Sequence, residues 1–382
     1  MNKYYSQYLN TLNNEVIPFW LKHSKDESGA INNCLAEDGT VLSKDRFIWS
    51  QGRALWTYSA LYNKIEKKQE YLDRANGLFN YLLTVRPEKN QSWNYLYDEN
   101  GNVKVGPSSI YVDSFVLIGM TEYYKMTKNP IAKEIALELF EHTYELIKNP
   151  GSYGVAPRTI PEGMEIHGVY MVFSFFYHEL AMAIGSKEID DVAVSLANKI
   201  LTKFYSKEKD AVIEFIRVDG SRQDTAPERL CMPGHTLETL WFLITIFEDR
   251  NDKEKILECC RLIKRHAELG WEGQDKGMCL AIDIDGKLPV FRDKADYRAW
   301  WVHCEALVAT AYAYKHTKDE WFLDMHEKIN QFAFSHYPTK YGEWINWLDS
   351  NLEVAPSAAL PVKDPFHLPR ALIYMIKLFE KM

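Results

Sequence analysis

Apolar residues recur three or four positions apart along most of the 382-residue chain, which is the spacing of a helix rather than of a strand. Turn-forming residues such as Asn129-Pro130 and Asn149-Pro150-Gly151 separate the periodic stretches. The pattern predicts helices, in six consecutive pairs, over residues 4–23, 46–65, 67–86, 109–127, 130–148, 167–184, 186–206, 235–249, 252–269, 299–317, 319–337 and 367–381.

The predicted helices are of two kinds. Residues 169–183 and 237–247 are apolar on every side, as buried helices are, whereas residues 252–266 carry charge on one face. Buried helices ringed by amphipathic ones describe an all-α fold, an (α/α)6 barrel of twelve helices. Residues 211–217 and 278–283 have strand character, and we expect them to form short β-hairpins at the barrel mouth. No linker rich in Pro, Gly or Ser divides the chain, so we expect a single domain over residues 1–382.

Composition and charge narrow the class of ligand. The chain has 45 Lys and Arg against 53 Asp and Glu, a net charge of −8, which argues against nucleic acid as a partner. It also has 11 Trp, 23 Tyr and 18 Phe, and amphipathic rings of this kind line sites for neutral, partly polar ligands such as sugars. We therefore expect a small-molecule sugar as the ligand. A homodimer is left open.

The expected location is cytoplasmic. The six cysteines show no CxxC pair and no framework spacing, which is typical of reduced thiols. The first twenty residues lack the apolar core of a signal peptide, and no stretch of 18 residues is apolar and uncharged, so we expect no association with a membrane.

Two predicted inner helices begin with residues suited to catalysis. Trp49 and Arg53 lie one turn apart and share a helix face with Arg46. His235 and Glu238 also share a face, and a carboxylate near an imidazole can orient it as a general base. A buried structural histidine or a helix cap would give the same pattern. Zinc is disfavoured because the HExxH motif is absent.

Aromatic and charged residues gather at the start of two further helices. Arg298, Trp300, Trp301 and Glu305 open the predicted helix over residues 299–317. A tryptophan near the barrel mouth offers a flat face to a sugar ring, although core packing would explain either one. His367 opens the last helix, where the helix dipole disfavours its protonated form. Only the fold could bring it close to His235.

Five segments in order along the chain carry a resemblance. They are WSQGRALWTYSALY (49–62), MPGHTLETLWFL (232–243), a run over residues 270–309 that contains GW, DIDGK and WWVHCEALVA, then YGEW (341–344) and FHLPR (366–370). With these segments the chain resembles the N-acylglucosamine 2-epimerase family, which includes cellobiose 2-epimerases, mannose epimerases and mannose isomerases. The resemblance implies an (α/α)6 barrel and a reaction at C2 of a reducing sugar that needs no cofactor and no metal.

The resemblance also implies roles for individual residues. His235 and His367 look like the two acid/base groups, Arg53 like the arginine that stabilises the enediolate, and Glu238 like the partner of His235. The expected substrate-binding residues are Trp49, Tyr111, His167, Arg298, Trp301, Glu305 and Trp344. For His167, a cap on its own helix is an equal alternative.

Two departures from the family pattern bear on the substrate. Residues 358–370 lack the paired glycines typical of N-acetylglucosamine epimerases, and His167 resembles a histidine of the cellobiose and isomerase branches. Both favour an unmodified hexose over an N-acetylated one.

Three other functions remain open at this point. One is an aldose–ketose isomerase of the same fold. A second is an inverting glycoside hydrolase, which would need two opposed carboxylates drawn from Glu238, Glu305 and Glu343. The third is a sugar-binding protein without catalysis.

Overall fold

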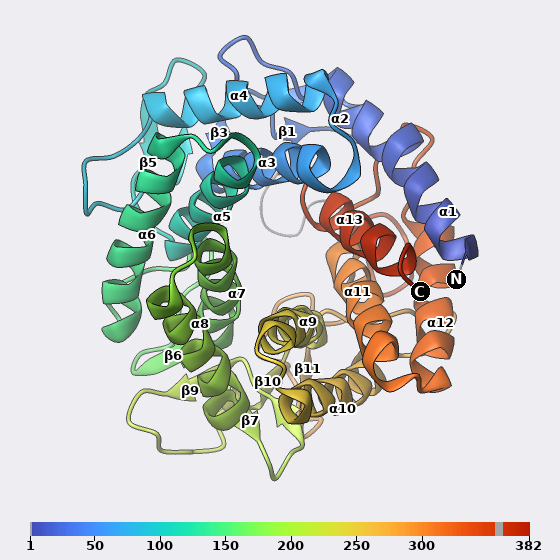
Figure 1. Cartoon of the computed structure of the whole chain (residues 1–382). Coiled ribbons are helices and arrows are strands. Elements are labelled where there is room, and N and C mark those ends of the chain that lie inside the picture. Colours follow the sequence, from blue (N-terminus) through green and yellow to red (C-terminus); the bar gives the residue numbers. More distant parts are fainter. Residues whose placement is uncertain (1, 356–361) are drawn as a thin grey trace.

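Helices arranged in two concentric rings make up the computed structural model, which describes residues 2–355 and 362–382 (Figure 1). The inner ring consists of α3 (Ile48–Ala60), α5 (Ile110–Thr127), α7 (His167–Ile184), α9 (Pro233–Asp249), α11 (Trp300–Thr317) and α13 (His367–Phe379). The outer ring consists of α1 (Asn2–Thr11), α2 (Ile17–His23), α4 (Gln69–Thr84), α6 (Pro130–Lys148), α8 (Lys187–Lys199), α10 (Lys253–Gly270) and α12 (Glu320–His336). The predicted (α/α)6 barrel is confirmed. Of the segment 358–370, residues 358–361 lie outside the described residues.

Each predicted helix is present, with local differences. The predicted helix over residues 4–23 is α1 and α2 joined by a π-helical turn at Leu12–Val16. Similar turns at Leu61–Ile65 and Ile200–Phe204 extend α3 and α8. The prediction for residues 186–206 ran slightly too far, because Tyr205 and Ser206 leave the helix and form a strand.

The inner ring packs tightly because two of its helices meet at glycines. Gly52 of α3 faces Gly119 of α5, and a Cβ on Gly119 would lie 2.5 Å from the carbonyl oxygen of Gly52. A Cβ on Gly52 would lie equally close to the carbonyl oxygen of Phe115. The two helix backbones can approach this closely only without side chains at the crossing point. This contact fixes the position of Arg53, which follows Gly52.

The ring closes across the two ends of the chain. The first helix belongs to the outer layer, and Figure 1 shows α1 beside α12 and near α13. Within this contact, Tyr8 Oη lies 2.7 Å from His326 Nε2 and donates to Asn330 Oδ1 at 2.9 Å. The sixth pair of the barrel therefore joins the last inner helix to the first outer one.

Short strands gather at the N-terminal ends of the inner helices. They are β1 (Cys34–Leu35), β2 (Val41–Ser43), β3 (Arg46–Phe47), β4 (Leu96–Tyr97), β5 (Val103–Val105), β6 (Met164–Ile166), β7 (Tyr205–Ser206), β8 (Ala211–Val212), β9 (Phe215–Arg217), β10 (Leu230–Cys231), β11 (Ile282–Asp283), β12 (Arg298–Ala299) and β13 (Trp347–Leu348). The strands β3, β6, β10 and β12 lead directly into α3, α7, α9 and α11.

The expected hairpins are only partly right. Residues 211–217 divide into β8, which forms a hairpin with β7, and β9, which pairs with the distant β6. Of residues 278–283, Ile282 and Asp283 are a strand, and they pair with β10 rather than with a neighbour in sequence. The strands thus tie successive loops of the barrel together at the end where the inner helices begin.

Two further expectations can be compared with the structure. All six cysteines are buried and form no disulfide in the described chain. No helix in residues 2–355 and 362–382 has the length and apolar character needed to cross a membrane.

Candidate active site

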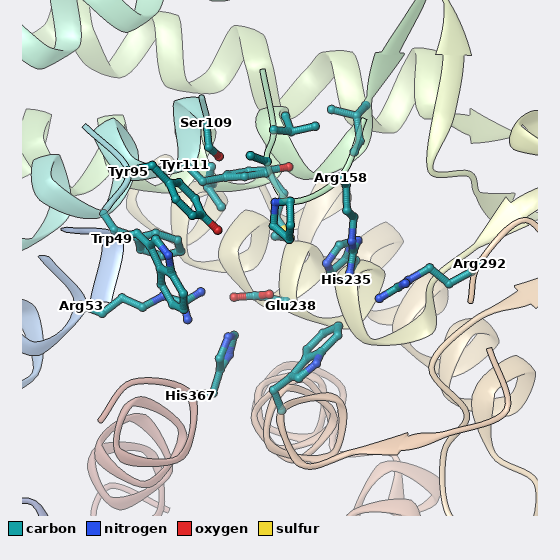
Figure 2. A pocket seen from close by; sticks show the side chains of 18 of the residues that line it. Trp49, Arg53, Tyr95, Ser109, Tyr111, Arg158, His235, Glu238, Arg292 and His367 are labelled. Carbon is teal, nitrogen blue, oxygen red and sulfur yellow. The ribbon is translucent and has the colours of Figure 1, made fainter. Parts of the chain in front are cut away.

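A cavity of about 280 Å³ opens at the end of the barrel where the inner helices begin. That volume is close to the lower end of the range for small-molecule sites, so it suits a small ligand rather than a polymer. All six inner helices contribute side chains to it, and loops supply the rest (Figure 2). The polar and aromatic residues that line it are Trp49, Arg53, Tyr95, Ser109, Tyr111, Phe115, Arg158, His235, Glu238, Arg292, Trp300, Trp301, Trp347 and His367.

His367, at the first position of α13, presents a neutral imidazole to the cavity. Its Nδ1 lies 2.8 Å from Oε1 of Glu305, a fully buried carboxylate. Burial, followed by the positive charge of Arg53, holds the pKa of His367 well below its usual value. The neutral ring has a single N–H, and the Glu305 carboxylate can only accept, so the proton belongs on Nδ1. Nε2 is then the atom free to take a proton from a substrate.

His235, near the start of α9, has a carboxylate partner of its own. Its Nδ1 lies 3.2 Å from each carboxylate oxygen of Glu214, which is buried between β8 and β9. Burial by itself would raise the pKa of Glu214, but the imidazoles of His235 and His167 hold it well below its ordinary value. Glu214 is therefore a carboxylate that orients His235 and leaves its Nε2 available.

The rings of both histidines lie close to the indole of Trp301. The Trp301 ring lies 5.3 Å from the His235 ring and 5.8 Å from the His367 ring, measured between ring centroids. Both histidines line the same cavity. The barrel thus brings together two residues that lie far apart in the sequence.

Arg53 lies on the His367 side of the cavity (Figure 2). Its Nη1 donates to Oδ2 of Asp364 at 3.2 Å, and its guanidinium lies 4.0 Å from the Phe115 ring centroid. Burial lowers the pKa of Arg53, and Asp364 acts in the opposite direction. A guanidinium so held is a fixed positive charge against the cavity.

A second arginine joins two carboxylates beneath the cavity. Arg370 Nη2 donates to Glu305 at 2.7 Å and to Glu238 at short range. Burial alone would lower the pKa of Arg370, but Glu305 and Glu238 raise it well above its usual value. Oxygens of the two carboxylates and a nitrogen of His367 lie within 4.8 Å of one another, a spacing that also suits a metal ion. The Arg370 guanidinium already supplies the balancing positive charge there.

The structure corrects the expected role of Glu238. We expected it to be the partner of His235, but the hydrogen-bond partner of that ring is Glu214, and Glu238 pairs with Arg370. Figure 2 shows the Glu238 carboxylate near the middle of the cavity. His235 and Glu238 share a helix face, but the Glu238 carboxylate turns toward the guanidinium of Arg370 and not toward the imidazole.

The other expected substrate-binding residues divide into two groups. Trp49, Tyr111 and Trp301 line the cavity. Glu305 does not reach it and instead supports His367 and Arg370. His167 is buried behind the wall, where its Nε2 lies 3.0 Å from Thr239 Oγ1 and its Nδ1 lies 3.7 Å from Glu214.

Arg298 and Trp344 have structural contacts instead of cavity positions. Arg298 is buried and donates to the Glu272 carboxylate and to two backbone carbonyl oxygens. Trp344 is buried with its ring stacked on Tyr337, 5.8 Å between centroids. Neither side chain lines the cavity. Arg46 likewise points away and pairs with Asp26 at 3.0 Å.

Sequence reasoning missed several residues of the site. Glu214 carried a detectable signal, because it is a single carboxylate within the apolar run AVIEF (211–215). Arg370 stands in the quoted segment FHLPR, but nothing in the sequence showed that it reaches Glu238. Arg158 and Arg292 come from loops without periodicity, so no pattern could place them at the cavity.

Comparison with known proteins supports one interpretation of this arrangement. The family described as N-acylglucosamine 2-epimerase (GlcNAc 2-epimerase) matches residues 29–371. The N-acylglucosamine 2-epimerase of Bos taurus is 28% identical, over 94% of this chain and 87% of its own length. The cellobiose 2-epimerase of Dictyoglomus turgidum is 24% identical, over 97% of this chain and 98% of its own. The solved structure of cellobiose 2-epimerase from Bacillus thermoamylovorans superposes with a TM-score of 0.85, at 22% identity over 99% of this chain and 100% of that one.

Proposed function

This chain belongs to the N-acylglucosamine 2-epimerase family and is a carbohydrate 2-epimerase, and on that premise we propose that His235 and His367 invert C2 of a reducing aldose. The observation that carries the proposal is the matched pair of imidazoles. Each ring has its Nδ1 against its own buried carboxylate, and both rings line one cavity.

The chemistry of C2 inversion explains why two such groups are needed. Opening the sugar ring gives an aldehyde, whose carbonyl group acidifies the proton on C2. Nε2 of one histidine removes that proton, and the electron pair of the C–H bond becomes part of a planar enediolate. The second histidine then delivers a proton from its Nε2 to the opposite face of C2. Histidine suits both roles because it exchanges protons near neutral pH.

The surrounding charges fit this sequence of steps. His367 is held neutral and can act as a base, and Glu305 stabilises the imidazolium that forms when it takes the proton. Glu214 stabilises positive charge on His235 in the same way. Arg53 presents a fixed charge to the oxygen atom that becomes negative in the enediolate. The indole of Trp301, which lies close to both rings, offers a flat apolar surface to the carbon chain.

The glycoside hydrolase alternative lacks support. Inverting hydrolysis needs two carboxyl groups on opposite sides of the scissile bond. Among the described residues that line the cavity, Glu238 is the only carboxylate. Glu305 lies beneath His367 and Arg370, and Glu343 is buried against the indole nitrogen of Trp20.

The identity of the product tests the proposal. Purified protein is incubated with mannose, glucose, N-acetylmannosamine or cellobiose, and products are identified by NMR. We expect at least one aldose to give its C2 epimer. A ketose as the sole product would replace epimerisation with aldose–ketose isomerisation. No reaction of any aldose, charged sugars included, would contradict the proposal.

A further inference from the structure

Two arginines on one side of the cavity have no acidic partner. Arg158 and Arg292 both line the cavity, on loops before α7 and before α11. Neither forms an ion pair within residues 2–355 and 362–382, and the seven remaining residues, 1 and 356–361, include no acidic side chain. The only hydrogen bond that a side-chain nitrogen of either residue makes in this part of the chain runs from Arg158 Nη1 to the sulfur of Met232, at 3.8 Å.

The positive charges of the two guanidinium groups also repel each other. Burial, followed by the positive charge of Arg158, lowers the pKa of Arg292 to about 10. Glu214 and Asp293 act in the opposite direction, but neither carboxylate forms an ion pair with Arg292, and Glu214 is engaged by His235 and His167. Nε of Arg292 is buried without an acceptor among the described residues. Two like charges that share a partly desolvated wall are unfavourable unless an anion lies between them.

Figure 2 shows where the two arginines lie relative to His235 and Arg53. Arg158 and Arg292 approach the cavity beside His235, on the side opposite Arg53. If Arg53 binds the oxygens on C1 and C2, the rest of an open-chain aldose extends away from it, toward these two arginines. Planar guanidinium groups bind phosphate and carboxylate through paired hydrogen bonds.

From this arrangement we propose that the preferred substrate is an aldose whose terminal carbon carries an oxyanion, as a phosphate ester or a carboxylate, bound between Arg158 and Arg292. The inference rests on the proposed function, since it takes the reacting carbon to lie between the histidines. It adds a charged substrate class to the neutral hexose that the sequence favours.

Kinetics with matched substrates test the inference. The value of kcat/KM is measured for mannose, mannose 6-phosphate and mannuronate, and for the glucose series. We expect at least one anionic sugar to exceed its neutral parent by about 10- to 100-fold, the value of one or two charged hydrogen bonds. The phosphate and the carboxylate arms show which oxyanion fits. Equal kcat/KM values for neutral and anionic sugars would overturn the inference.

Substitution of the two arginines tests whether they cause the preference for an anionic sugar over its neutral parent. Arg158→Met and Arg292→Met should each lower the ratio of kcat/KM for the anionic sugar to kcat/KM for the neutral sugar about 10-fold or more, mainly by raising KM for the anionic sugar. Arg158→Lys should keep part of the preference. Arg222→Met removes the same charge from an exposed position and should change nothing. An anionic preference that survives in both methionine variants would contradict the assignment.

A binding measurement separates this inference from the proposed function. A sugar without a reducing carbon, 1,5-anhydroglucitol 6-phosphate, cannot react but retains the anionic end. By calorimetry it should bind wild-type protein at least about 10-fold more tightly than 1,5-anhydroglucitol does, and the Arg158→Met Arg292→Met double variant should lose the difference. Absence of any difference in the wild type, both for this phosphate and for the corresponding C6 carboxylate, would overturn the inference even if neutral aldoses are epimerised. If binding behaves as expected but no aldose reacts, the proposed function fails instead.

Discussion

The two sides of the cavity balance their charges in different ways. On the His367 side, Arg53 pairs with Asp364, and Arg370 pairs with Glu238 and Glu305. On the His235 side, Glu214 pairs with the histidines, and Arg158 and Arg292 have no ion pair in the described chain. The contrast suggests a division of work. Charges that are balanced internally hold the reacting groups in place, and charges without an internal partner select the ligand.

The largest expected effect comes from removing either imidazole. We expect His235→Asn and His367→Asn each to lower kcat by about 10²- to 10⁴-fold, the usual contribution of a general acid or base. Circular dichroism should show an intact fold. His142→Asn, on the outer helix α6, is the matched control and should keep wild-type turnover. Wild-type kcat in either cavity variant would remove that residue from the mechanism.

The next effect contrasts a paired arginine with an unpaired one. Arg370→Met leaves Glu238 and Glu305 buried without their shared cation, so the free energy of unfolding should fall by about 3–5 kcal/mol. Arg292→Met breaks no ion pair in the described chain and relieves repulsion from Arg158, so it should change stability by less than about 0.5 kcal/mol. Denaturant unfolding of both variants measures the difference. Equal losses of stability in the two variants would mean that the charges of both arginines are balanced within the protein.

A further effect concerns imidazoles buried outside the cavity. Burial lowers the pKa of His303 to about 3 and the pKa values of His266 and His326 to about 4. Below pH 6.5 these three histidines take up protons in the unfolded chain and not in the folded chain, so their contribution to stability falls as pH decreases from 6.5 toward 4. For each histidine, one unit of difference between the pKa in the folded chain and the pKa in the unfolded chain changes the free energy of unfolding by at most about 1.4 kcal/mol.

Two buried carboxyl groups act in the opposite direction over the same range, because burial raises the pKa values of Asp113 and Glu343 to about 7. The histidines are therefore followed individually, by NMR of their ring signals between pH 7.5 and 5. The rings of His266, His303 and His326 should stay neutral throughout this interval. Protonation of any of them above pH 5 in the folded protein would contradict its buried, neutral state.

The helices could be predicted from the sequence because their signal is local. The periodicity of residues 237–247 identifies α9 as an inner helix without knowledge of any partner. The short strands were harder to predict, because β10 pairs with β11 and β6 with β9 across long separations. In two- or three-residue strands the alternating pattern is too short to specify a partner.

The positions of the proposed reacting groups could be predicted from the sequence, whereas the contacts that support them could not. His235, His367 and Arg53 stand in segments that resemble the family, and the structure places all three at the cavity. Which carboxylate supports which ring depends on side-chain direction. Glu238 shares the helix face of His235 but turns to Arg370, and Glu214 reaches His235 from a loop between strands. Loop positions of this kind follow from tertiary packing alone.

Isotope labelling during the first few per cent of conversion in deuterated water tests the central claim most directly. With two imidazoles on opposite faces, the product epimer should carry deuterium at C2 from its first appearance, while the unreacted aldose keeps its proton. His235→Asn and His367→Asn should each still exchange the C2 proton of one epimer, and a different epimer in each variant. A product that retains the original C2 proton, or a ketose labelled at C1, would contradict the two-histidine mechanism.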